Sequence, residues 1–158
     1  MEFKQFSESH ARQLTSWFPT QDQFLLWGGF VFTWPLTADE LIIRSKLSGL
    51  EFCVLTDGNM LLGFIELKRV SDREMRLCRV VVTPHIRGKG LGKALVSHAV
   101  EYIKQSTHCT AVTLAVFTAN KLAFNCYHSL GFKTIDIGPK SHEVNGQQWP
   151  LLQMSLDL

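Results

Sequence analysis

The stretch from Val80 to Lys93 joins an apolar run and a proline turn to a glycine-rich loop with basic side chains. The loop alternates glycine with other residues and holds three cations: Gly88, Gly90 and Gly92, with Arg87, Lys89 and Lys93. Because glycine has no Cβ, the backbone of such a loop can approach a ligand closely and point successive N–H groups at it. A helix that begins at the loop adds unpaired N–H groups and partial positive charge. The stretch therefore predicts a site for a pyrophosphate or a similar polyanion.

Two familiar phosphate-binding loops do not fit the spacing of these glycines. A Walker A loop has two glycines five residues apart, followed by Lys and then Ser or Thr. Here Ala94 follows Lys93, and Arg87 stands five residues before Gly92. A dinucleotide-binding loop has glycine at its first, third and sixth positions, and the sixth position counted from Gly88 is Lys93. The pattern that fits is Arg-x-x-Gly-x-Gly, from Arg87 through Gly90 to Gly92.

Asn120 and Tyr127 form a second group whose spacing bears on chemistry. The run from Asn120 to Leu130 predicts a helix, which Gly131 closes because glycine suits the left-handed conformation that follows a helix. Residues seven apart lie two helical turns apart, so the amide and the phenol share one face of this helix.

The hydrophobic pattern indicates the elements that must position these groups. Strands are expected at Glu2–Phe6, Glu51–Thr56, Met60–Val70, Met75–Val82, Ala111–Val116, Lys133–Ile137 and Gln148–Leu156. Helices are expected at about His10–Trp17, Thr37–Leu47, Gly90–Gln105 and Asn120–Leu130, whereas Phe24–Pro35 is ambiguous between a short helix and a loop. This order predicts an α/β fold, in which helices flank a mixed, mostly antiparallel central sheet. A length of 158 residues favours a single domain over residues 1–158.

The composition limits the classes of function. A net charge of +2 is too small to favour nucleic acid as a partner. The chain has no apolar run of membrane-spanning length, and its first residues lack the pattern of a signal peptide, so we expect a cytoplasmic protein that does not contact membranes. The cysteines are widely spaced and form no CxxC pair, so neither a disulfide framework nor a metal site is expected: Cys53, Cys78, Cys109 and Cys126.

Taken together, three motifs resemble those of the GNAT superfamily of N-acetyltransferases. They are Val82-Thr83-Pro84, the Arg-x-x-Gly-x-Gly loop, and the run from Asn120 through Ala123 to Tyr127-x-x-Leu-Gly-Phe. The motifs occur in the order of the family with one strand between the last two, and the expected elements also follow the family. The resemblance implies the fold of this family and acetyl-CoA as the acyl donor.

The resemblance also implies which residues bind the cofactor. The pantetheine arm would pair with the backbone of Val80, Val81 and Val82, where a backbone N–H can polarise the thioester carbonyl. The diphosphate would lie on Arg87, Gly88, Lys89, Gly90, Leu91 and Gly92, with Lys93 at the edge. Asn120 would hydrogen-bond the pantetheine arm, and Ala123 would lie beside it.

The catalytic roles follow from the same resemblance. Tyr127 would be the general acid that protonates the departing CoA thiolate. Many relatives place a glutamate base on the strand after the long helix, but the matching run Val112–Val116 has no acidic residue. We rank Glu66 first as the base, because it lies on the hairpin beside the cofactor strand, and ordered water is an equal alternative. The other candidates are Asp72, Glu74, His85 and His128.

The leading hypothesis is an enzyme that transfers the acetyl group of acetyl-CoA to a primary amine by direct attack. The acceptor would be a small-molecule amine or a protein amine, and the sequence favours neither. The protein would act as a monomer or a homodimer. The alternative is a non-catalytic module that senses acyl-CoA, and binding of a phosphate ligand or nucleic acid through the basic loop is the least favoured hypothesis.

Overall fold

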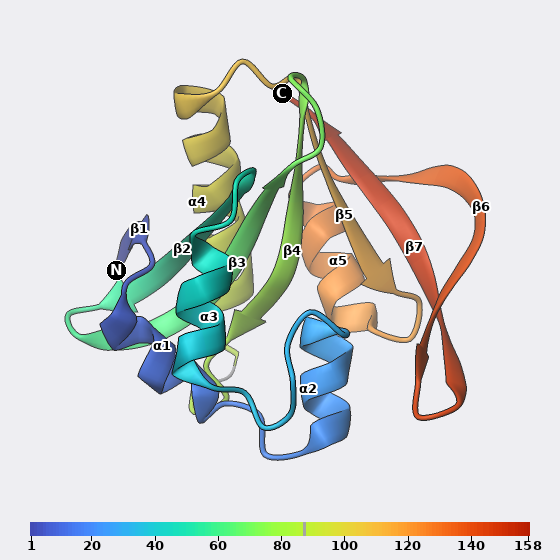
Figure 1. Cartoon of the computed structure of the whole chain (residues 1–158). Helices are drawn as coiled ribbons and strands as arrows, with labels where there is room; N and C mark the ends of the chain where they lie inside the picture. Colours follow the sequence, from blue (N-terminus) through green and yellow to red (C-terminus); the bar gives the residue numbers. More distant parts are fainter. Residues whose placement is uncertain (87) are drawn as a thin grey trace.

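The computed structural model describes residues 1–86 and 88–158 and has one seven-stranded sheet flanked by helices (Figure 1). The strands are β1 (Glu2–Gln5), β2 (Leu50–Asp57), β3 (Met60–Arg69), β4 (Glu74–Val82), β5 (Ala111–Phe117), β6 (Lys133–Val144) and β7 (Gln147–Asp157). The helices are α1 (Glu8–Thr15), α2 (Gln21–Gly28), α3 (Ala38–Ser45), α4 (Leu91–Ser106) and α5 (Lys121–Ser129). In the sheet the strands follow the order β1-β2-β3-β4-β5-β7-β6. The predicted α/β fold with a mostly antiparallel sheet is confirmed.

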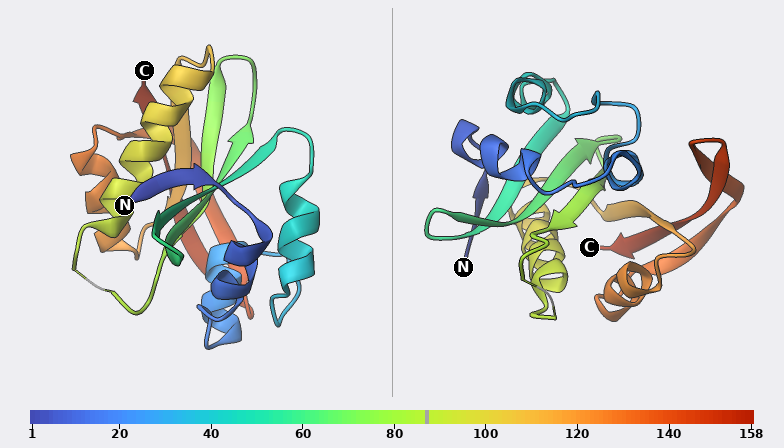
Figure 2. Two further views of the ribbon diagram at one scale, coloured as in Figure 1. Left: turned by 90° about the vertical axis from the view of Figure 1, so that its left-hand side faces the viewer. Right: turned by 90° about the horizontal axis from the view of Figure 1, so that it is seen from below.

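The helices cover both faces of the sheet. Helices α1, α2 and α3 lie on one face, and α4 and α5 lie on the other (Figure 2). Each face has its own apolar core because each strand alternates its side chains between the two sides. One core gathers around Phe24, Leu41 and Phe64, and the other around Leu95 and Ile103. Among the described residues, no helix is both long enough and apolar enough to cross a membrane.

The sheet opens in its middle, between β4 and β5. These two strands pair in parallel from Glu74 to Leu77 on β4 and from Ala111 to Leu114 on β5. Beyond that point β4 continues to Val82 beside β3, whereas β5 continues to Phe117 beside β7. A bulge on β4 marks the separation, since Arg79 has a φ of 51° and the register with β3 shifts between Phe64 and Glu66. The opening lies where the sequence predicted the cofactor strand to end.

Two segments differ from the sequence-based expectation. Helix α2 begins at Gln21, before the ambiguous stretch Phe24–Pro35, and ends within it at Gly28. Its N-terminus is fixed because the Thr20 side chain accepts a hydrogen bond from Gln23 N. Strand β6 extends to Val144, seven residues beyond the expected end at Ile137. It continues because the register with β7 shifts between Ile135 and Lys140, which resumes the pairing after an irregular stretch.

Candidate active site

A cavity of about 860 Å³ occupies the opening between β4 and β5. Its walls come from four places in the chain: α2, the second half of β4, the β5–α5 segment, and the β6–β7 hairpin. One half therefore faces α5, which has Asn120 as its N-cap and carries Tyr127, and the other half faces α2 and the β6–β7 hairpin. We refer to these as the donor half and the acceptor half.

The donor half brings together residues that are about forty positions apart in the sequence. Val80, Val81 and Val82 line it from β4, while Asn120, Ala123 and Tyr127 line it from the segment that begins α5. The two motifs noted in the sequence thus face the same cavity from opposite sides. Their roles toward a cofactor stay predictions.

The glycine loop at the start of α4 offers an open backbone surface. Gly88 and Gly90 have φ values of 67° and 70°, which side chains other than glycine rarely adopt. A Cβ built on Gly88, Gly90 or Gly92 meets no described heavy atom within 4 Å, so a ligand has room to approach. Lys89 and Lys93 are exposed beside this surface, and Arg87 lies outside the described residues.

The N-terminus of α4 has the electrostatic character of an anion site. Its N-cap residue is Gly90, which has no side chain to cap the first N–H groups, and no other described side chain caps them. Its first turn holds Lys93 and no acidic residue. The unpaired N–H groups and the positive end of the helix dipole thus remain available to an anion. The loop therefore fits the diphosphate of coenzyme A.

Asn120 is the N-cap of α5 as well as a wall of the cavity. Its Oδ1 accepts a hydrogen bond from Ala123 N at 3.1 Å. This bond fixes the side chain at the helix end and uses the amide oxygen. The amide NH₂ is the group that remains to donate a hydrogen bond to a ligand.

Tyr127 is a buried phenol at the floor of the cavity, with 8% of its surface exposed. Its ring packs edge-on against Phe132, with the ring centroids 6.1 Å apart. Burial, with a smaller contribution from Cys126, raises the pKa of Tyr127 to about 12, because desolvation penalises the phenolate. The phenol therefore keeps its proton at neutral pH, as a general acid must before it donates.

Aromatic side chains form much of the acceptor half: Trp17, Phe18, Trp27, Phe117, His142 and Trp149. Several of them stack or pack edge-on, for example Phe18 on Trp27 at 4.5 Å and Phe117 on Trp149 at 5.9 Å. Two cations, Arg76 and Arg79, also line the cavity. No Asp or Glu occurs among the lining residues that the structure describes.

His142 is a lining residue that the sequence reasoning missed. It lies on the part of β6 beyond the expected end of the strand, and its ring is 5.8 Å from Phe30 and 6.3 Å from Phe117. Among the described lining residues it is the one imidazole, a side chain that can both accept and donate a proton. No spacing pattern marks it, because its place depends on the register shift in β6.

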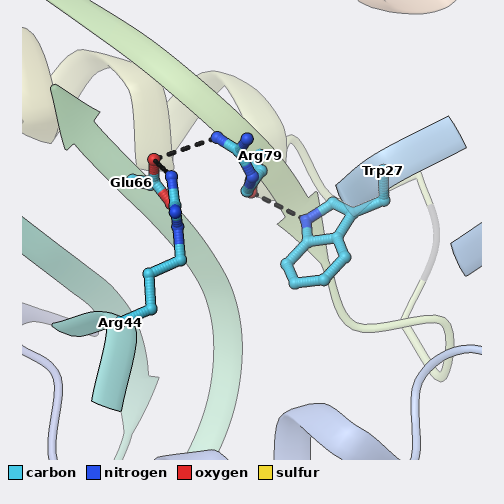
Figure 3. A network of polar contacts seen from close by, with 4 residues as sticks. All are labelled: Trp27, Arg44, Glu66 and Arg79. Atoms are coloured by element: carbon cyan, nitrogen blue, oxygen red, sulfur yellow. Dashed lines mark hydrogen bonds and ion pairs between the residues drawn. The ribbon is translucent and has the colours of Figure 1, made fainter. Parts of the chain in front are cut away.

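Glu66 is not among the described residues that line the cavity, and its carboxylate meets two arginines, Arg44 and Arg79 (Figure 3). The carboxylate is fully buried and accepts hydrogen bonds from Arg44 Nε and Nη2 at 3.0 Å each and from Arg79 Nη1 at 2.9 Å. Two guanidinium groups thus occupy both of its oxygens. This geometry favours a structural role for Glu66 over the predicted role as base, because a base must reach the acceptor nitrogen.

The other four residues considered as the base lie outside the described cavity wall. None of them is among the described residues that line the cavity: Asp72, Glu74, His85 and His128. Glu74, for example, accepts a hydrogen bond from Thr113 Oγ1 at 2.7 Å at the paired end of β4.

Comparison with known proteins identifies the family. Residues 11–132 match the model of the Acetyltransferase (GNAT) family, which is more than half of the chain. The chain therefore belongs to the GNAT family of acetyltransferases. The resemblance that the motifs indicated is confirmed.

Two curated relatives match at the level of sequence. An uncharacterized N-acetyltransferase of Methanocaldococcus jannaschii is 30% identical over 116 residues, covering 70% of this chain and 47% of the relative. The N-acetylaspartate synthetase of Danio rerio is 31% identical over 91 residues, covering 57% of this chain and 32% of the relative. The chain thus spans less than half the length of these relatives.

Solved structures share the whole fold at low sequence identity. A spermidine N-acetyltransferase from Vibrio cholerae, in complex with CoA and spermine, has a TM-score of 0.81 at 18% identity, covering 99% of this chain and 94% of that one. A ribosomal-protein-alanine N-acetyltransferase from Brucella melitensis has a TM-score of 0.77 at 14% identity, with both chains fully covered. An acetyltransferase from Salmonella typhimurium with acetyl-CoA also has a TM-score of 0.77, at 18% identity, covering 99% of this chain and 93% of that one. At these identities the likeness establishes the fold.

Proposed function

We propose that this protein transfers the acetyl group of acetyl-CoA to a primary amine. The observation that carries the proposal is the cavity in the split sheet, where Val80–Val82 face Asn120 and Tyr127 beside an open glycine loop. A thioester held along β4 lies within the same cavity as the phenol, and its phosphates reach the N-terminus of α4. The acceptor amine enters from the opposite, aromatic half.

The reaction requires one bond to form and one to break. The neutral amine nitrogen attacks the thioester carbonyl carbon, and the C–S bond breaks as the tetrahedral intermediate collapses. Tyr127 donates its proton to the departing sulfur, and backbone N–H groups of β4 stabilise the oxyanion. The proton lost by the nitrogen balances the proton that Tyr127 gives up.

We assign removal of the amine proton to His142 or to water held beside it. His142 lies on the acceptor half, and a neutral imidazole can accept a proton through its unprotonated ring nitrogen. Cys78 also lines the cavity, but burial, followed by the nearby carboxylate of Glu66, raises the pKa of its thiol, so it stays protonated. The pairing of Glu66 with Arg44 and Arg79 supports this assignment over Glu66.

The lining also favours one class of amine. A polyamine carries several positive charges, and burying each of them requires a carboxylate or a comparable partner. The described acceptor half offers aromatic rings and two arginines instead. We propose that the acceptor has a single amine on an apolar or aromatic body, unlike the spermine that is bound to the structural relative from Vibrio cholerae.

A thiol-release assay with a matched set of amines tests this function. Phenethylamine and tryptamine are expected to release CoA thiol at a higher kcat/KM than spermidine and putrescine. Acetyl-CoA should also raise the melting temperature by mass action. The absence of a shift at millimolar acetyl-CoA would contradict cofactor binding, and a shift without thiol release from any amine would point to a sensor. A preference for spermidine would refute the proposed acceptor class.

A further inference from the structure

We infer that Trp27, Arg44 and Glu66 form a positioning network that holds the bulge of β4 at Arg79. The purpose of the network is to keep Val80–Val82 at the cavity wall. The effect of this network on turnover can be measured only if the proposed acetyl transfer is correct. Its effect on the affinity for acetyl-CoA can be measured independently of that proposal. Figure 3 shows the four residues and the contacts between them.

The bulge imposes an unfavourable backbone conformation on an ordinary side chain. Arg79 has a φ of 51°, in the left-handed region that residues with a Cβ adopt at a cost. Glu66 pairs with Cys78 and Phe64 pairs with Val81, so two residues of β4, Arg79 and Val80, stand opposite the single Ile65. The strand that lines the donor half begins directly after this point. The conformation of Arg79 therefore sets the direction of the cofactor strand.

The side chain of Arg79 is held from β3 and α3. Its Nη1 donates to Glu66 Oε1 at 2.9 Å, and the same carboxylate receives Arg44 from α3 through two hydrogen bonds of 3.0 Å. Glu66 has no exposed surface, and the side chains of Arg44 and Arg79 are 19% and 17% exposed. Such charge-assisted bonds in a buried place fix the guanidinium closely.

The backbone of Arg79 is held from α2. Trp27 Nε1 donates to the carbonyl oxygen of Arg79 at 2.8 Å. The indole stacks with two rings, Phe18 at 4.5 Å with 29° between the planes and Phe32 at 5.6 Å with 7°. The guanidinium of Arg44 lies 5.8 Å from the ring centroid of Phe32, which closes a ring of contacts around the bulge.

Stability alone is a poor reason for this arrangement. Buried ion pairs contribute little to stability compared with well-packed apolar residues of the same volume. Arg79 Nε is moreover buried without a hydrogen-bond partner among the described residues, which is a further cost. A role in holding the backbone conformation of Arg79 at the edge of the cavity accounts for the buried ion pairs and for the cost of the unpaired Nε. Because Trp27 also lines the acceptor half, the network joins the two halves of the site.

The decisive experiment compares Arg79→Gly with Arg79→Ala. Both variants remove the guanidinium, but glycine adopts the left-handed conformation freely, whereas alanine keeps the strain without the bonds that offset it. We expect kcat/KM, and the affinity for acetyl-CoA measured by thermal shift or fluorescence, to be about 5–30-fold higher in the glycine variant. Arg12→Ala, on the exposed surface of α1, serves as the control and should behave as the wild type.

Three outcomes would overturn the inference. Equal losses in both Arg79 variants would mean that the guanidinium contacts a substrate directly. Equal kinetics and equal acetyl-CoA affinity, with a difference in melting temperature alone, would mean that the bulge matters to folding only. Wild-type kinetics in Trp27→Phe, which keeps the stacked ring and loses the N–H donor, would remove Trp27 from the network. A wild type without turnover would contradict the proposed function, while the difference in acetyl-CoA affinity would still decide the network.

Discussion

Replacing Glu66 by Gln separates a catalytic base from a buried structural carboxylate. The substitution keeps the volume of the side chain and removes its charge. The two guanidinium groups of Arg44 and Arg79 then face a neutral amide whose NH₂ group cannot accept their hydrogen bonds. Because the carboxylate has no exposed surface, water cannot replace it without disturbing the packing.

The expected cost in stability is large. Breaking a buried ion pair by removing one partner destabilises a protein by roughly 3–5 kcal/mol. In a chain of this size each kcal/mol lowers the melting temperature by about 2–4 °C, so we expect a decrease of roughly 6–20 °C. Thermal unfolding followed by circular dichroism measures this decrease. Glu143→Gln, an exposed position on β6, is the matched control and should unfold within about 2 °C of the wild type.

The pH profile then decides the role of Glu66. A positioning carboxylate lowers kcat/KM when it is replaced but leaves the shape of the profile unchanged, because the group that titrates during turnover is still present. A catalytic base behaves in the opposite way, since its loss removes the acidic limb of the profile. A Glu66→Gln variant that keeps the wild-type melting temperature and loses that limb would refute our interpretation and restore Glu66 as the base.

Four further predictions concern the cavity and the loop. Tyr127→Phe should lower kcat by about 10²-fold or more while acetyl-CoA still raises the melting temperature, and an unchanged kcat would remove the phenol as the acid. His142→Gln should lower kcat/KM for the amine while acetyl-CoA still raises the melting temperature, and an unchanged kcat/KM would leave the base role to water. Gly92→Ala, in the first turn of α4 with open space around the added Cβ, should keep or raise the melting temperature but weaken acetyl-CoA binding at least tenfold, because the methyl group lies where the phosphates approach. In alkaline titration Tyr102 and Tyr127 should both ionise near pH 12, which absorbance at alkaline pH measures. The stability that Tyr127 contributes is complete below about pH 10 and should be lost as the pH rises through its raised pKa, a loss that the Tyr127→Phe variant should not show.

The donor half was open to prediction because its determinants are local in the sequence. The positive φ values at Gly88 and Gly90 belong to residues two positions apart in one loop, and the spacing of Asn120 and Tyr127 follows from one helix. The order of the strands likewise follows from runs of apolar residues and from short turns. Such features are set by neighbours in the chain, so their pattern is visible before the fold is known.

The general base and the acceptor half could not be predicted from local sequence patterns. Glu66 looked accessible on its hairpin, and its burial depends on Arg44, a residue of α3 that lies 22 positions earlier in the chain and meets it only in the folded protein. His142 reaches the cavity because of the register shift in β6, and no residue type or spacing announces such a shift. Predictions from sequence fail here for the same physical reason: both side chains owe their surroundings to tertiary contacts.

The same contrast explains how a shared fold can accept different amines. The walls that we propose to receive the thioester come from β4 and α5, which carry motifs resembling those of the family, whereas the acceptor half comes from α2 and the β6–β7 hairpin. In this chain those two segments meet directly, since a Cβ added to Gly29, which follows α2, would lie 3.6 Å from the His142 ring. A change in the register of β6 therefore reshapes the acceptor half, whereas a change in α2 would also reach the donor half, because Trp27 of α2 bonds the bulge of β4. Exchange of the β6–β7 hairpin with that of a polyamine-acetylating relative should accordingly change the preferred amine while the affinity for acetyl-CoA, measured by thermal shift, stays within about threefold. A parallel loss of acetyl-CoA affinity would show that the hairpin also positions the donor half.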